Sequence, residues 1–135
     1  MKTPKPSRAL LIEFETYSNY SIRVEFAKDL VDAVKKIKDI GSIAGNVDNT
    51  AAAVTLSDGD MTSYVFIKPG STYGTIAHEA LHAVNYMMKK LGINGNEDND
   101  ENTAYHLGFV VNHIVAFRNK QTRGKRGKTK HSHRR

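Results

Sequence analysis

The sequence predicts an α+β domain in which a small antiparallel or mixed sheet packs against two long helices. Residues 20–26 alternate apolar and polar side chains, which is the period of a strand with one buried face. An Asp58-Gly59 pair lies between two β-rich runs, as in a β-hairpin. Residues 72–91 and 98–119 instead carry apolar side chains at helical spacing, and a small sheet packed on such helices is typical of the α+β class.

The first third of the chain is expected to contain two strands and one helix. The strands cover residues 9–14 and 20–26, which are the first two apolar runs of the chain. Between residues 27 and 40 the apolar side chains instead recur at helical spacing and form a single stripe. Gly41 is expected to end this helix.

The remainder of the chain is expected to form a hairpin followed by two helices. The hairpin strands cover residues 52–56 and 62–68. The first helix ends before Gly92, because glycine commonly follows a helix C-terminus. The second helix begins near Asp98, and Glu101 three residues later completes the pattern of a capping pair. The predicted order is therefore two strands, a helix, two strands and two helices.

Length and composition favour a single domain in the cytoplasm. A chain of 135 residues is long enough to bury a core without disulfides. It contains no cysteine, so any metal must be held by histidine and carboxylate side chains. The N-terminal residues have no apolar stretch of signal-peptide length, and no run approaches the roughly 20 apolar residues of a membrane-spanning helix. We therefore expect a soluble protein that does not contact a membrane.

The net charge of +6 is unevenly distributed along the chain. Residues 118–135 hold nine Lys or Arg and no acid, which leaves eleven basic and fourteen acidic side chains in residues 1–117. We therefore divide the chain into a flexible leader (1–7), a folded domain (8–117) and a basic tail (118–135). The tail has no apolar side chain to bury, so we expect it to be disordered and to contact nucleic acid or an acidic protein surface.

The helix over residues 72–91 carries the motif His-Glu-Ala-Leu-His at residues 78–82. His78 and His82 are four residues apart, so both side chains project from one helix face, close enough to bind one metal ion. Glu79 lies about 100° further around the helix, beside the ion rather than on it, which suits a general base that activates water. A chance match in a chain of this size occurs on the order of a few times per thousand. The motif therefore indicates a metal site more strongly than two ordinary surface histidines.

A catalytic zinc ion normally takes three protein ligands, so the motif needs one more. Glu101 is the first choice, because it lies 19 residues after His82 in the first turn of the next helix. It shares a helical stripe with Ala104 and Gly108, whose small side chains would let the two helices approach closely. Glu101 alternatively serves only as a capping carboxylate, and His106 is the second choice as a ligand. Both alternatives stay open at this point.

The strand that precedes the histidine helix offers a place for an extended peptide. Residues 64–67 lead through Pro69-Gly70 into this helix. A peptide can add its backbone to the edge of a sheet, so a strand beside the motif is expected to bind a peptide or protein substrate.

The motif at residues 78–82, followed by Glu101 on a second helix, resembles the gluzincin branch of the zincin metallopeptidases. More narrowly, it is similar to the minimal metallopeptidase-like proteins encoded by bacteriophages. The resemblance covers residues 45–117 and is specific only at the two helices.

This resemblance implies a zincin-like fold and a bound Zn²⁺ ion. His78, His82 and Glu101 would bind the ion, and Glu79 would activate water for attack on a peptide carbonyl. A related group of zincins, the SprT-like proteases, uses a third histidine, which would make His106 the ligand.

Two functions from different classes follow from these expectations. The first is a zinc peptidase that acts on a protein near nucleic acid or in phage assembly, in the host cytoplasm or the virion. The second is a non-catalytic structural or nucleic-acid-associated phage protein that retains a zincin fold. Hydrolysis of peptides separates the two, whereas zinc content separates them only in part.

Overall fold

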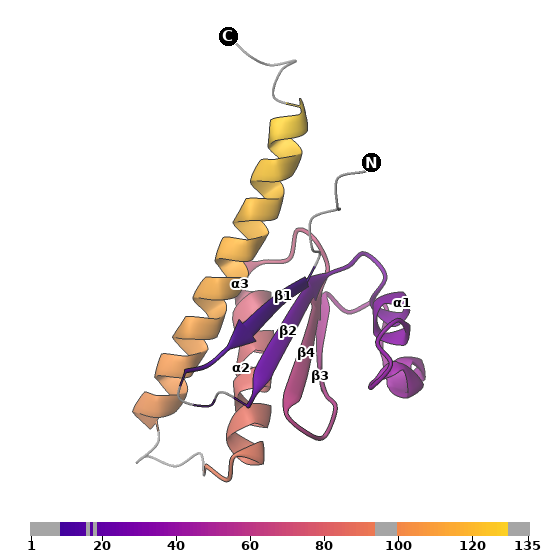
Figure 1. Cartoon of the computed structure of the whole chain (residues 1–135). Coiled ribbons are helices and arrows are strands. Elements are labelled where there is room, and N and C mark those ends of the chain that lie inside the picture. Colours follow the sequence, from indigo (N-terminus) through magenta and orange to yellow (C-terminus); the bar gives the residue numbers. More distant parts are fainter. Residues whose placement is uncertain (1–8, 16, 18, 94–99, 130–135) are drawn as a thin grey trace, which may run out of the picture.

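The structure, a computed structural model, describes residues 9–15, 17, 19–93 and 100–129, with side chains described as far as Arg123. Its elements follow in the predicted order of two strands, a helix, two strands and two long helices (Figure 1). They are β1 (Ala9–Glu13), β2 (Ser21–Phe26), α1 (Leu30–Lys35), the 3₁₀ helix η1 (Gly41–Asn46), β3 (Ala53–Ser57), β4 (Thr62–Ile67), α2 (Tyr73–Lys90) and α3 (Asp100–Thr129). The α+β class is therefore confirmed.

The four strands form one mixed sheet in the order β1-β2-β4-β3. The β1/β2 and β3/β4 pairs are antiparallel, whereas β2 and β4 run parallel, with Val24 opposite Val65. β4 occupies the interior because it is apolar on both faces: Val65 and Ile67 pack on one side of the sheet, Tyr64 and Phe66 on the other. β1 and β3 are therefore the two edges of the sheet.

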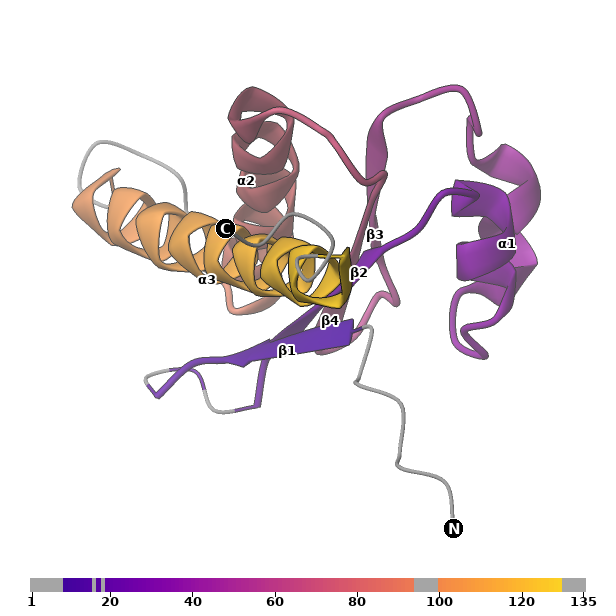
Figure 2. The ribbon, with the colours of Figure 1, turned by 90° about the horizontal axis from the view of Figure 1, so that it is seen from above.

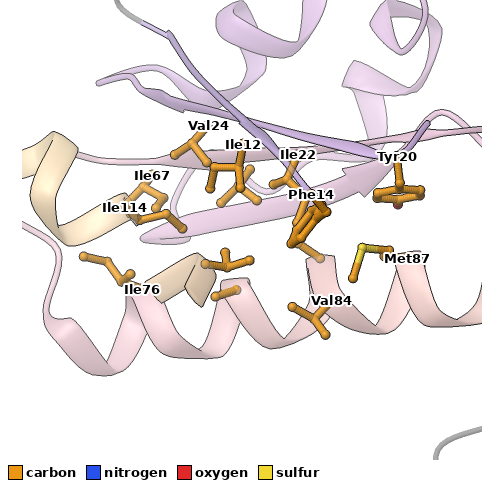
Figure 3. Packing of buried hydrophobic residues seen from close by; sticks show 14 of the residues in the cluster. Ile12, Phe14, Tyr20, Ile22, Val24, Ile67, Ile76, Val84, Met87 and Ile114 are labelled. Atoms are coloured by element: carbon orange, nitrogen blue, oxygen red, sulfur yellow. The ribbon is translucent and has the colours of Figure 1, made fainter. Parts of the chain in front are cut away.

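The larger core lies between the sheet and the two long helices, which cover the same face (Figures 1 and 2). Figure 3 shows Ile22 and Val24 of β2 above Ile76 of α2, with Ile114 of α3 between them. All four side chains are fully buried. Burial of an aliphatic side chain of this size contributes about 1.5–3 kcal/mol. This layer therefore holds α2, the helix with the histidine motif, firmly against the sheet.

A second core lies on the opposite face of the sheet, where α1 and η1 cover β3 and β4 (Figure 2). Leu30, Val34 and Ile40 are buried there against Phe66. The sheet is thus a central layer with helices on both faces, although α1 and η1 cover less of it than α2 and α3 do.

α1 is shorter than the helix predicted over residues 27–40. It begins after Asp29, whose carboxylate accepts a hydrogen bond from the Asp32 amide at 2.9 Å. Beyond Lys35 the chain tightens into three-residue turns instead of continuing the helix. These turns carry Ile40 into the second core, so tertiary burial decides where the helix ends.

A predicted turn and a predicted helix end are confirmed. Gly59 (φ 78°) turns the chain between β3 and β4, and the Asp58 carboxylate supports the turn by accepting a hydrogen bond from the Asp60 amide at 2.8 Å. Gly92 (φ 75°) follows α2, as expected of a glycine after a helix C-terminus. Both positive φ angles are conformations that glycine adopts without steric cost.

The prediction of a disordered tail from residue 118 is wrong for residues 118–129, because α3 continues to Thr129. Arg118 anchors this part of the helix: its Nη1 donates to the Ser71 carbonyl at 2.9 Å, and its guanidinium lies 4.4 Å from the centre of the Tyr73 ring. Lys, Arg and Gln are also good helix formers, and cations are favoured near a helix C-terminus. The basic composition therefore does not end the helix.

Some predictions fall outside the described residues. These are the flexible leader (1–7), the last part of the tail (130–135) and the capping role of Asp98. In the part of the chain that the structure does describe, no helix is both long enough and apolar enough to cross a membrane.

Candidate active site

The two motif histidines lie side by side on α2. Thr72 begins this helix by accepting a hydrogen bond from the Thr75 amide at 3.1 Å. His78 and His82 follow on the solvent-facing side, and their Nε2 atoms are 3.2 Å apart. Their ring planes are inclined by 78°, so the rings do not stack, and the two nitrogens face one another.

This separation fits a shared zinc ion. Zinc binds histidine nitrogen at about 2.0–2.1 Å in tetrahedral geometry, so two nitrogens on one ion lie about 3.3 Å apart. The observed 3.2 Å between the Nε2 atoms of His78 and His82 is close to this value. The same distance also suits one N–H···N hydrogen bond, in which one ring donates and the other accepts. The pair is therefore placed to bind a cation without rearrangement of α2.

Glu79 points away from solvent and toward the sheet. Only 8% of its surface is exposed. The Thr55 hydroxyl of β3 donates to Glu79 Oε1 at 2.8 Å and also lies 3.2 Å from the Glu79 carbonyl oxygen. The other carboxylate oxygen, Oε2, is 3.9 Å from His78 Nε2. Thr55 thus holds one oxygen of the carboxylate, while the second oxygen lies toward His78.

Thr55 is a residue of the candidate site that the sequence analysis did not identify. It is 24 positions from Glu79, and one threonine in a β-strand carries no distinguishing pattern. The contact exists only because the hairpin of β3 and β4 packs against α2.

Replacement of Thr55 by Val is expected to lower the free energy of unfolding by about 1.5–3 kcal/mol, because it leaves a buried carboxylate oxygen without its hydrogen-bond donor. Urea denaturation of both proteins measures the difference. Thr55→Ser is the matched control, since it keeps the hydroxyl and should lose less stability than Thr55→Val. Equal stability of Thr55→Val and wild type would show that the hydrogen bond has no structural role.

The predicted third ligand does not join the histidine pair in this structure. Glu101 is exposed on the first turn of α3. Among the residues that the structure describes, no three His, Cys, Asp or Glu side chains gather as a metal site. Glu101 as a ligand therefore stays a prediction.

The packing face predicted for α3 is wrong, which explains the position of Glu101. Ala104 and Gly108, expected to lie against the neighbouring helix, are exposed. Val110 and Ile114 are fully buried instead, because they remove more apolar surface from water than alanine and glycine can. The helix is rotated accordingly, and Glu101 turns toward solvent.

His106, the second choice as a ligand, is buried near β1, at the edge of the sheet opposite β3. Its ring lies 5.6 Å from the Phe14 ring and 5.3 Å from the Tyr17 ring, and its Nδ1 donates to the Asn102 carbonyl at 2.8 Å. Phe14 directly follows β1, whereas Glu79 contacts β3 at the opposite edge of the sheet. Three strand spacings separate β1 from β3, so these two edges of the sheet lie about 14 Å apart. His106 is therefore a packed core histidine in this structure.

The strand edge beside the site belongs to β3, not to residues 64–67 as predicted. Those residues lie in β4, which is paired on both sides. In the β3/β4 pair, Lys68 N donates to Ala52 O, and Asp58 N donates to Thr62 O. Because hydrogen-bonded pairs alternate along antiparallel strands, the backbone groups of residues 53, 55 and 57 point outward from the sheet.

A shallow groove connects this free edge to the histidine motif. Its lining residues come from the start of β3 and the first turns of α2, and they are Ala51, Ala52, Ala53, Thr72, Gly74, Thr75, His78 and Glu79. The groove therefore ends at the candidate base and one of the two histidines.

The structure thus brings together His78, His82, Glu79 and Thr55, and it leaves Glu101 and His106 apart from them. The three motif side chains belong to one helix, and the fourth comes from the adjacent edge strand. Comparisons of this chain with protein-family models, with curated proteins and with solved structures found no match.

Proposed function

We propose that this protein is a zinc-dependent peptidase with a zincin-like fold, in which His78 and His82 bind the ion and Glu79 acts as the general base. The single observation that carries this proposal is the pair of Nε2 atoms 3.2 Å apart, with a Glu79 oxygen 3.9 Å from one of them. Two surface histidines with no shared role would not need to place their Nε2 atoms this close together. Water would satisfy the hydrogen-bonding nitrogens of each ring separately.

The chemistry divides between the ion and the side chains. A zinc ion held by His78 and His82 would supply Lewis-acid chemistry, which polarises a carbonyl and makes water a stronger acid. Glu79 Oε2 takes a proton from the attacking water and later delivers it to the amine that leaves. Thr55 holds Oε1 at 2.8 Å, so the carboxylate cannot turn away from the reacting water.

The free edge of β3 provides the place for the peptide. A strand that adds to this edge would exchange hydrogen bonds with residues 53, 55 and 57 and lie about 4.8 Å from β3. It would then run along the groove that reaches His78 and Glu79. Main-chain pairing of this kind binds extended peptides of many sequences, with side-chain preference set by the groove.

The function is tested by loading the full chain with zinc and exposing it to a broad peptide library, with mass spectrometry of the products. We expect about one zinc ion per chain and cleavage of a subset of peptides. A zinc-loaded protein that cleaves none of them would support the second function instead, a non-catalytic protein of the same fold. The long basic end of α3 is the observation that favours this alternative.

Glu101→Ala tests the third ligand. We expect zinc affinity to fall by about tenfold or more if Glu101 reaches the ion, since even residues that only support a ligand change affinity 10–100-fold. Asp100→Ala is the matched control, because Asp100 is exposed in the same helical turn and should not change affinity. Equal affinities of Glu101→Ala and wild type, measured by competition with a chelator, would remove Glu101 from the site.

A further inference from the structure

The C-terminal part of α3 projects from the domain. Figure 1 shows its last turns extending beyond the sheet and α2. We call residues 118–129 the basic arm. At a rise of 1.5 Å per residue, these residues span about 18 Å of helix.

Lys and Arg positions of the basic arm occur all around the axis of the helix. Six of its positions are Lys or Arg, and the chain has no acidic residue after Glu101. These positions are 118, 120, 123, 125, 126 and 128. Successive residues are about 100° apart on a helix, so the six positions are spread over all sides rather than one. Lys120 and Arg123 are exposed, and neither forms an ion pair within the described part of the chain.

In the described part of the chain, α3 itself offers no nearby counter-charge for the basic arm. The acidic residues of α3 are Asp100 and Glu101, and about 26 Å of helix separates them from Arg118. Like charges three or four residues apart on a helix repel one another. A partner that presents negative charge on several sides at once would remove this repulsion.

We propose that the basic arm binds double-stranded DNA by lying in the major groove. The B-DNA major groove is about 12 Å wide and admits one α-helix, and a phosphate backbone runs along each side of it. A helix that is cationic on all sides can meet both backbones, whereas an acidic protein surface would contact only one side. The major groove of duplex RNA is too narrow for a helix. The arm has no apolar or aromatic side chain, so it contacts phosphates without sequence preference.

Arg118 fixes the basic arm relative to the candidate active site. Its hydrogen bond to the Ser71 carbonyl and its contact with Tyr73 join the start of the arm to the first turn of α2. Thr72 and Gly74, on either side of Tyr73, line the groove that leads to His78. DNA on the arm is therefore held at a defined position next to this groove. The DNA-binding proposal does not depend on the peptidase activity.

The charge of the arm is tested by fluorescence anisotropy with a labelled 20-base-pair DNA duplex. We expect the wild-type chain to bind with a Kd of about 10⁻⁶–10⁻⁴ M at physiological salt. Substitution of Arg123, Lys125, Arg126 and Lys128 by Gln should weaken binding at least about tenfold and reduce the slope of log K against log salt by up to about 3.6. The control replaces four lysines at and near α1, across the sheet from α3, by Gln. It should leave Kd within about twofold of the wild-type value. These lysines are Lys28, Lys35, Lys36 and Lys38. Unchanged binding of the arm variant would overturn the proposal.

The helical form of the arm is tested at constant charge with Gly124→Pro and Gly124→Ala. Proline breaks the helix within the arm, whereas alanine favours it, and neither changes the charge. We expect Gly124→Ala to bind DNA as tightly as wild type or more tightly, and Gly124→Pro to bind at least about fivefold more weakly. Equal affinities of the two variants would show that a flexible tail suffices, which would overturn insertion of a helix in the groove.

Competitors separate DNA from other polyanions. Unlabelled DNA duplex should displace the labelled duplex at a lower phosphate concentration than duplex RNA does. Poly-glutamate should compete more weakly than DNA at the same concentration of charge. Displacement by poly-glutamate at the same charge concentration as DNA would overturn the proposal in favour of an acidic protein partner.

Discussion

Replacement of Glu79 by Gln is expected to abolish peptide hydrolysis while zinc stays bound. Gln has nearly the same shape as Glu, and its carbonyl oxygen can still accept the hydrogen bond from Thr55. Its amide cannot take a proton from water, so the general-base contribution of about 10²–10⁴-fold is lost. Initial rates on the peptides that wild type cleaves, together with zinc content by mass spectrometry, give both quantities.

Glu13→Gln is the matched control for this experiment. Glu13 is an exposed glutamate on β1, at the sheet edge opposite the site, so the same chemical change there should leave hydrolysis unaffected. If Glu79→Gln kept full activity with zinc bound, Glu79 would not be the base. If it lost zinc as well, Glu79 would be acting as a ligand.

Replacement of His78 or His82 by Ala is expected to have the second large effect, a loss of zinc affinity of more than about 100-fold. Loss of a residue that only supports a ligand weakens affinity 10–100-fold, and loss of a direct ligand costs more. Each substitution removes one of the two nitrogens that lie 3.2 Å apart. Competition with a coloured chelator measures the affinity of each variant.

His113→Ala serves as the control for the histidine variants. His113 is exposed on α3, where its Nδ1 donates to the Phe109 carbonyl at 2.8 Å, and it is not part of the motif. Its replacement should leave zinc affinity unchanged. If all three histidine variants bound zinc equally well, the motif would not be a metal site. Because His78 and His82 are exposed, neither substitution is expected to unfold the protein.

The features that the sequence predicts correctly depend on residues close together in the chain. The strand of alternating residues (20–26), the turn at Gly59, the helix end before Gly92 and the order of elements follow from patterns over a few neighbouring residues. The two neighbouring imidazoles follow from one helical turn between His78 and His82. Local backbone geometry is sufficient for each of these predictions.

The rotation of α3 depends instead on competition between its faces. The sequence offers a stripe with Ala104 and Gly108 and another with Val110 and Ile114, and both have helical spacing. Only the tertiary structure shows that the larger side chains are buried, which turns Glu101 toward solvent.

The sequence by itself determined the class of the fold, the helix that carries the motif and the residues on one face of it. The tertiary structure alone decided that β3 is the free edge, that Thr55 holds Glu79, and that Arg118 joins a continuing helix to the start of α2. These contacts join residues 24 and 47 positions apart. They depend on how whole elements pack to bury apolar surface, and no local pattern specifies that arrangement.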